Sequence, residues 1–192
     1  MWPRLGSSKF VTRWILVTLA SSIVATLDGG WLASWAALAP SRILHGEVWR
    51  LATWPLIEAG PLSLVLTCAA IYKFGGELAV RWGDRRLRRF IGAIVVGAAV
   101  LTCGLAAIAG GAHLERLGGW AVTDALVIAW ARQFPERTLV LYGLVAVRGR
   151  ELLAVTLGIA ILIAIYVGPI AMAPELIACS AAATFPRTLL RR

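Results

Sequence analysis

Three acidic residues lie within or at the edge of apolar segments, and they are the first candidates for chemistry: Glu58, Asp124 and Glu175. A charged carboxylate at the centre of a bilayer costs roughly 2.5–3.5 kcal/mol on insertion scales, so it rarely faces lipid. We therefore expect Asp124 to point into a helical bundle, either as a polar or proton-handling site or as a hydrogen-bonded buried carboxyl. Glu58 and Glu175 fall near the outer ends of their segments, where we expect solvated side chains.

The histidines and cysteines give no pattern that is typical of a metal or cofactor site. His45 and His113 both fall between apolar segments, so no predicted spanning helix offers the usual imidazole ligand for haem. Cys68, Cys103 and Cys179 each lie inside an apolar run without CxxC spacing, which is typical of small packing residues. We therefore expect no cofactor, no metal and no disulfide framework.

The composition excludes a soluble domain and a disordered chain. Of the 192 residues, 59% are hydrophobic and 15% are charged, whereas a soluble domain has about 45–50% apolar and about 25% charged residues. Disordered chains are poorer still in apolar residues. The net charge of +9 does not indicate nucleic-acid binding, because the basic residues lie between apolar runs. The sequence predicts a single integral membrane domain over residues 1–192.

Six apolar segments predict an all-α bundle of six transmembrane helices. Each is near the lower end of the roughly 17–25 residues that a spanning helix needs. The segments are residues 11–27, 62–74, 90–109, 119–134, 152–167 and 170–185. The loop 28–54 between the first two holds four tryptophans, which favour the headgroup level of a bilayer, so we expect this loop to be interfacial.

The distribution of basic residues predicts the orientation. With the N-terminus inside, 16 of the 19 Lys and Arg residues fall on the inner side, and only Arg42, Arg50 and Arg116 fall outside. The positive-inside rule then places both termini in the cytoplasm. Residues 81–89 are expected to form an inner-face loop, attracted to anionic lipid by about 1 kcal/mol per basic residue. High Ala, Arg, Leu and Trp content favours a GC-rich bacterial genome and hence a bacterial inner membrane.

Small residues spaced four apart indicate close contacts between membrane helices. The fourth segment carries Ala121, Ala125 and Ala129 on one face, and the sixth carries Ala178 and Ala182. This spacing predicts a close crossing of the two helices, with chance as the alternative because alanine is frequent throughout the chain.

Most of the chain after residue 36 resembles the rhomboid intramembrane proteases and derlins. Residues 40–53, with the sequence PSRILHGEVWRLAT, resemble the loop before the second rhomboid span, including its Trp-Arg pair at Trp49 and Arg50. Residues 74–83, FGGELAVRWG, resemble the exit from that span. Residues 118–125, GGWAVTDA, lie where rhomboids carry the Gly-x-Ser-Gly nucleophile segment.

The catalytic residues of that family do not carry over. Rhomboids pair a serine on the fourth span with a histidine on the sixth, which acts as its base. Counting back from Pro135 places Trp120 at the serine position, and the histidine falls on Glu175. Three further polar positions of the family fall on Ser63, Thr67 and Glu58. An indole cannot act as an acyl-transfer nucleophile, so the resemblance implies a pseudoprotease rather than an enzyme.

Inactive rhomboid relatives bind transmembrane helices, so the resemblance implies a protein that binds transmembrane segments of other integral membrane proteins, as an accessory or structural subunit within the lipid bilayer. Candidate helix-packing or partner-binding residues are Trp49, Arg50, Trp120, Asp124 and Glu175. Two alternatives stay open. One is a divergent intramembrane protease, including an acid dyad of Asp124 and Glu175. The other is a small transporter or proton-handling module around Asp124.

Overall fold

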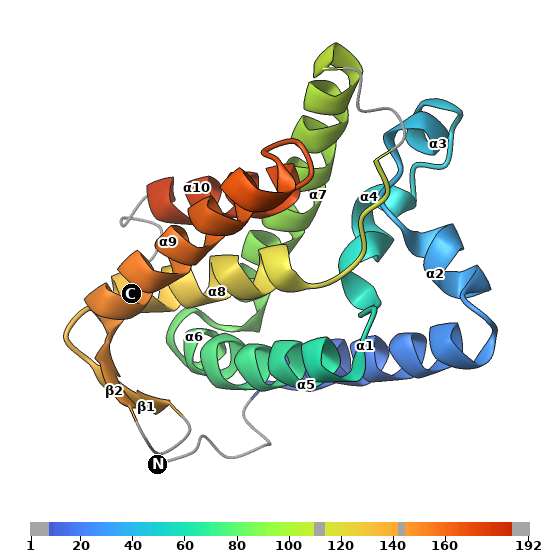
Figure 1. The fold of residues 1–192 in the computed structure, drawn as a ribbon. Helices are drawn as coiled ribbons and strands as arrows, with labels where there is room; N and C mark the ends of the chain where they lie inside the picture. Colours follow the sequence, from blue (N-terminus) through green and yellow to red (C-terminus); the bar gives the residue numbers. More distant parts are fainter. Residues whose placement is uncertain (1–7, 110–113, 142–144, 186–192) are drawn as a thin grey trace.

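A computed structural model describes residues 8–109, 114–141 and 145–185, which form a helical bundle and one short hairpin (Figure 1). The main helical segments are α1 (Lys9–Leu27), α5 (Pro61–Ala70) with its continuation through η2 (Ile71–Gly75) and α6 (Gly76–Trp82), α7 (Asp84–Ala109), α8 (Trp120–Gln133), α9 (Gly149–Val167) and α10 (Ala173–Thr184). All six predicted segments are therefore helical.

Only some of these helices have the length of a membrane span. Within the described residues, four stretches are long and apolar enough to cross a bilayer: Lys9–Leu27, Pro61–Trp82, Asp84–Ala109 and Gly149–Val167. With 14 and 12 residues, α8 and α10 fall short of the roughly 17 residues that a spanning helix needs. The structure thus supports a membrane protein with four candidate spans, and the predicted number of six is not established by helix length.

The second predicted segment is longer than the sequence indicated. The apolar segment ends at Phe74, but the helix continues through the π-helical turn η2 and α6 to Trp82. A Cβ atom at Gly75 would meet only ordinary van der Waals contacts at 3.7 Å. The true break is Gly83, whose φ of +82° is a conformation that glycine adopts without strain.

The expected inner-face loop over residues 81–89 was therefore wrong. Arg81 belongs to the last turn of α6, and α7 begins at Asp84, so the remaining arginines of the run lie on the first turns of a long helix. The buried side chains of Leu87 and Phe90 hold this part of α7 against the bundle. Burial of these two residues favours helix in a region whose charge predicted a loop.

The centre of the bundle is α8, which contacts α5, α7, α9 and α10. In Figure 1 it crosses between α5 and α10. Ten of its 14 residues are buried, including Leu126, Ile128 and Trp130. The five predicted contact alanines, Ala121, Ala125, Ala129, Ala178 and Ala182, are all between 0% and 2% exposed where α8 packs on α10. Their lack of bulk fits the close approach of these helices.

In contrast, α9 is largely exposed. Large apolar side chains such as Ile159, Leu162 and Ile165 are more than half exposed, and its buried residues are confined to Gly149, Leu152, Ala160 and Ala164. A helix that is apolar on nearly every side is stable only where its surroundings are also apolar. This surface fits a helix in contact with lipid or with another transmembrane helix.

The two ends of the bundle carry different connections (Figure 1). The loop between α1 and α5 forms short helices: α2 (Trp31–Ala36), α3 (Pro40–Leu44), α4 (Arg50–Thr53) and η1 (Trp54–Leu56). At the opposite end, β1 (Thr138–Leu141) pairs antiparallel with β2 (Val145–Arg148), in a register that places Thr138 opposite Arg148. The hairpin joins α8 to α9.

Gly149 allows the start of α9 to lie directly on the end of α8. A Cβ atom at this position would lie 2.3 Å from the backbone oxygen of Phe134, far inside contact distance. The backbone N–H groups of Gly149 and Arg150 donate to the carbonyls of Arg137 and Pro135, both at 3.0 Å. The backbones approach so closely here that no side chain fits.

We expect Gly149→Ala to lower the thermal unfolding midpoint of the detergent-solubilised protein, with a loss of about 1–3 kcal/mol, because backbone rather than a flexible side chain must move. The matched control is Gly158→Ala in the same helix, where a Cβ atom would meet nothing within 4 Å and alanine improves helix propensity by up to about 1 kcal/mol. Equal midpoints for the two variants would contradict this account of Gly149.

Candidate functional site

A buried carboxylate, that of Glu58, is the centre of a network where α1, α5 and α8 meet. Glu58 follows η1 and is 5% exposed. Its Oε2 accepts a hydrogen bond from the hydroxyl of Ser63. Its Oε1 accepts from the hydroxyl of Thr67 at 2.9 Å and from the backbone N–H of Gly119 at 2.6 Å. Its own N–H donates to Ser22 Oγ at 3.0 Å. Three donors thus compensate the burial of this carboxylate.

Local sequence explains how these donors converge. Ser63 and Thr67 are four residues apart on α5, so they share one face of the helix. Gly119 immediately precedes α8, and a Cβ atom there would lie 3.0 Å from both Glu58 Oε1 and Thr67 Cγ2. The absence of a side chain at Gly119 lets its N–H reach the carboxylate.

Trp120, the first residue of α8, extends the network to the surface. Its indole Nε1 donates to Ser63 Oγ at 3.1 Å, and the residue is 42% exposed. The Ser63 hydroxyl therefore accepts from the indole and donates to Glu58. Four positions that the resemblance singled out, Glu58, Ser63, Thr67 and Trp120, thus lie together in one hydrogen-bonded group.

Glu175 belongs to a separate cluster. Arg116 Nη2 donates to Glu175 Oε1 at 2.5 Å and to Met172 Sδ at 3.6 Å. The backbone of Arg116 pairs with that of Leu38 through hydrogen bonds of 2.9 and 3.0 Å, which ties the segment before α8 to the loop between α2 and α3. Within the described ranges, no hydrogen bond or ion pair joins Glu175 to Trp120.

The expectation of solvated side chains at Glu58 and Glu175 was wrong, since both residues are 5% exposed. Charge and position in the sequence do not reveal that folded loop segments cover this end of the bundle. Glu175 Oε2 is buried and accepts no hydrogen bond within the described part of the chain. Asp124, one turn beyond Trp120 on α8, is partly buried and lies close enough to Glu175 for their charges to interact.

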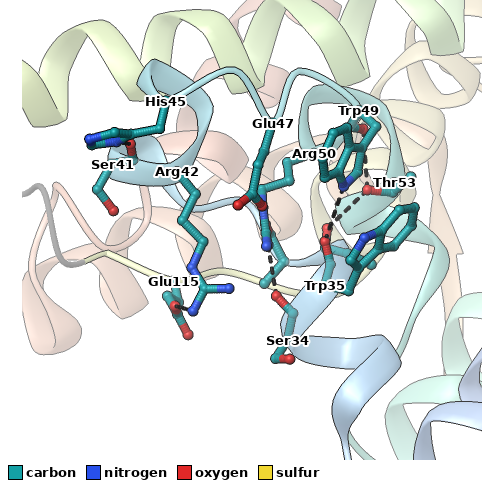
Figure 2. A network of polar contacts seen from close by, with 12 residues as sticks. Ser34, Trp35, Ser41, Arg42, His45, Glu47, Trp49, Arg50, Thr53 and Glu115 are labelled. Carbon is teal, nitrogen blue, oxygen red and sulfur yellow. Dashed lines mark hydrogen bonds and ion pairs between the residues drawn. The ribbon is translucent and has the colours of Figure 1, made fainter.

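Arg50 holds the loop between α1 and α5 together (Figure 2). The residue is 1% exposed, and its Nε lies 2.5 Å from Glu47 Oε2 in an ion pair. Its Nη1 donates to the carbonyls of Ser34 and Ala37 at 2.7 and 2.8 Å. Carbonyls at the end of a helix have no partners within it, and here the guanidinium supplies donors at the end of α2.

Trp49 packs on the same loop. Its ring stacks on that of Trp35 with centroids 5.3 Å apart, and its Nε1 donates to the Trp35 carbonyl at 3.4 Å. The Thr53 hydroxyl donates to the carbonyl of Ala36 at 3.0 Å. The Trp-Arg pair therefore stabilises a folded loop, and Trp49 remains 38% exposed.

A third polar cluster, centred on Glu77, lies at the other end of the helix that begins with α5 and was not predicted from the sequence. Glu77 Oε2 accepts from Trp130 Nε1 and Arg137 Nη1, both at 2.8 Å, and its Oε1 pairs with Lys73 Nζ at 2.8 Å. The four-residue spacing of Lys73 and Glu77 was the available signal. The cluster joins α6 to α8 through Trp130 and to the residue before β1 through Arg137.

Within the described residues, no group of three or more His, Cys, Asp or Glu side chains is arranged to hold a metal ion. His45 Nδ1 lies 2.7 Å from the carbonyl of Ser41. His113 lies outside the described residues, as do the terminal segments 1–7 and 186–192 that contribute to the predicted orientation.

A family model described as eukaryotic integral membrane protein (DUF1751) matches residues 9–187, and the chain therefore belongs to this family of integral membrane proteins. None of the curated proteins compared with the chain matches it. The predicted multi-pass membrane class is thereby confirmed. The inferred bacterial inner membrane is not supported, because the family is described as eukaryotic.

We expect Arg50→Lys to destabilise the protein by about 1–3 kcal/mol, because an ammonium cannot reproduce the fork that reaches Glu47 and two carbonyls while it stays buried. Thermal unfolding in detergent measures the effect. Arg42→Lys is the control, since Arg42 is 47% exposed and 3.9 Å from Glu115, and such surface pairs contribute about 0–1 kcal/mol. A midpoint for Arg50→Lys within error of that of Arg42→Lys would refute the role assigned to Arg50.

Glu58→Gln should also lower the unfolding midpoint. An amide of the same shape offers one acceptor oxygen where the carboxylate offers two, so at least one of the three donors loses its partner, at a cost of about 1–3 kcal/mol. Glu115→Gln is the matched control, because its side chain is 54% exposed. An unchanged midpoint for Glu58→Gln would show that the network does not stabilise the junction of α5 and α8.

Proposed function

We propose that this protein is a rhomboid-like membrane scaffold without proteolytic activity, which binds transmembrane segments of other proteins as an accessory or structural subunit. In this proposal all six main helical segments lie within the membrane, and both termini are cytoplasmic. The short α8 and α10 are then interior helices, surrounded by the longer ones. These two short helices have 14 and 12 residues, which suits positions in the interior of the bundle.

The observation that carries the proposal is the hydrogen-bonded group around Glu58 and Trp120. The position that the resemblance assigns to the nucleophile holds an indole, and that indole donates to Ser63. The Ser63 hydroxyl in turn donates to Glu58, whose lone pairs are engaged by two further donors. A carboxylate engaged in this way is a poor general base for a serine hydroxyl. The arrangement favours a structural network over acyl transfer.

The surface beside this network supports binding of apolar helices. Leu62 and Val65 are 71% and 63% exposed on α5, the helix that also carries Ser63, the hydrogen-bond partner of Trp120. In lipid, helices associate by van der Waals packing and by hydrogen bonds rather than by the hydrophobic effect. The exposed aliphatic side chains of α5 offer the first of these to a partner helix.

Site-specific photocrosslinking in native membranes tests this proposal. With a photoreactive phenylalanine analogue at position 65 or 120, we expect crosslinks to the same membrane protein, which also co-purifies in mild detergent at constant stoichiometry. The control position is Leu16, a 59% exposed residue on α1. Crosslinks of equal yield at all three positions, or a chain that purifies alone, would overturn the proposal.

A fluorophosphonate probe tests the enzyme alternative on the same preparation. We expect no labelling of this protein, while an active rhomboid protease added to the same membranes is labelled. Labelling that disappears in Ser63→Ala would identify Ser63 as a reactive nucleophile and would overturn the assignment as a pseudoprotease.

A further inference from the structure

A dense group of positive charges surrounds the junction of α6 and α7. We call it the basic collar: Lys9, Arg81, Arg85, Arg86, Arg88 and Arg89, all exposed. The carboxylate of Asp84 accepts a hydrogen bond from the backbone N–H of Phe10 at 3.3 Å. This contact brings the start of α1, and with it Lys9, to the start of α7. Six cations therefore share one small region with a single carboxylate.

The charge of the collar is not neutralised by the protein itself. None of its six residues forms an ion pair within the described segments, whereas exposed arginines elsewhere do, as in Arg42 with Glu115, Arg137 with Glu77 and Arg150 with Glu136. The segments outside the described ranges contain no aspartate or glutamate. Against these six cations the collar region holds the single carboxylate of Asp84, so most of the counter-charge must come from another molecule.

The collar is held rigidly at a defined level along α7. Trp82 and Phe90 are both buried and pack edge to face with ring centroids 5.4 Å apart, and four of the collar arginines, from Arg85 to Arg89, lie between them in the sequence. The large exposed apolar side chains of α7 begin at Val96. Seven residues separate Arg89 from Val96, which is about 10 Å along a helix. The headgroup region of a bilayer extends roughly 5–8 Å beyond the hydrocarbon on each side.

We propose that the basic collar is a binding site for the phosphates of anionic phospholipids in the leaflet at this end of the bundle. The positive charge of the collar suits the negative charge of lipid phosphates, and its distance from the exposed apolar part of α7 places it at the depth of those phosphates. Guanidinium groups bind phosphate oxygens through two parallel hydrogen bonds. Several arginines within reach of one another favour headgroups that carry more than one negative charge. Such a site requires neither a partner protein nor catalytic activity.

Binding of short-chain lipids to the purified full-length protein in neutral detergent tests the proposal. The ligands are dioctanoyl phosphatidylinositol bisphosphate, dioctanoyl phosphatidylserine and dioctanoyl phosphatidylcholine, with affinity measured by thermophoresis. We expect the order bisphosphate, then serine, then choline. Arg85→Gln/Arg88→Gln should weaken binding of the anionic lipids about fivefold per charge removed, while Arg85→Lys/Arg88→Lys retains most of it.

Arg42→Gln/Arg150→Gln is the matched control, since it removes two exposed arginines that lie outside the collar in weak ion pairs of 3.9 and 3.8 Å. It should bind anionic lipid like the unaltered protein. Equal affinity of the unaltered protein for all three lipids, or equal weakening in the two glutamine variants, would overturn the proposal. Soluble inositol hexakisphosphate binding as tightly as the bisphosphate lipid would assign the collar to free polyanions instead.

Discussion

The proposed six-helix bundle depends on a buried helix, α8, that is too short to span a bilayer. At 1.5 Å per residue, the 14 residues of α8 extend for about 21 Å, against about 30 Å of hydrocarbon. Backbone groups at the ends of such a helix need partners inside the protein, because lipid supplies none. Glu58 accepts from the N–H of Gly119, the residue before α8, and at the other end the carbonyl of Trp130 accepts from the N–H of Phe134. Just beyond that end, the N–H groups of Gly149 and Arg150 donate to the carbonyls of Arg137 and Pro135.

The same requirement explains why the loop between α1 and α5 is folded. Arg50 supplies donors to the carbonyls that end α2, and the backbone of Arg116 pairs with Leu38 beneath that loop. Arg116 then reaches Glu175 at the start of α10. The loop is therefore a covering layer, which excludes water from acidic groups that the helices alone would leave at the surface. Its buried arginine is compensated by an ion pair and by two carbonyls at once.

Hydropathy located all six helical segments because apolar side chains dominate each of them, whether they face lipid or the bundle. Hydropathy did not predict where helices begin and end when tertiary contacts determine those boundaries. The apolar segment ends at Phe74, yet the helix continues to Trp82, and the arginine run suggested a loop, yet buried Leu87 and Phe90 hold it in a helix. The resemblance singled out Glu58 together with Ser63, Thr67 and Trp120, but the sequence predicted a solvated side chain at Glu58, whereas the structure buries it among the other three. A carboxylate is buried only when several donors converge, and convergence of distant residues cannot be read from local composition.

The shared hydrogen bonds around Glu58 also affect how the sequence of this region can change in evolution. Ser63 both accepts from Trp120 and donates to Glu58, so the cost of altering one residue depends on the identity of the others. Energetic effects of residues in one network are not additive. A single substitution at any one of these positions is therefore expected to cost more than the same substitution made together with a compensating one. Such coupling preserves the group as a unit and makes its conversion to a different chemistry a change of several residues together.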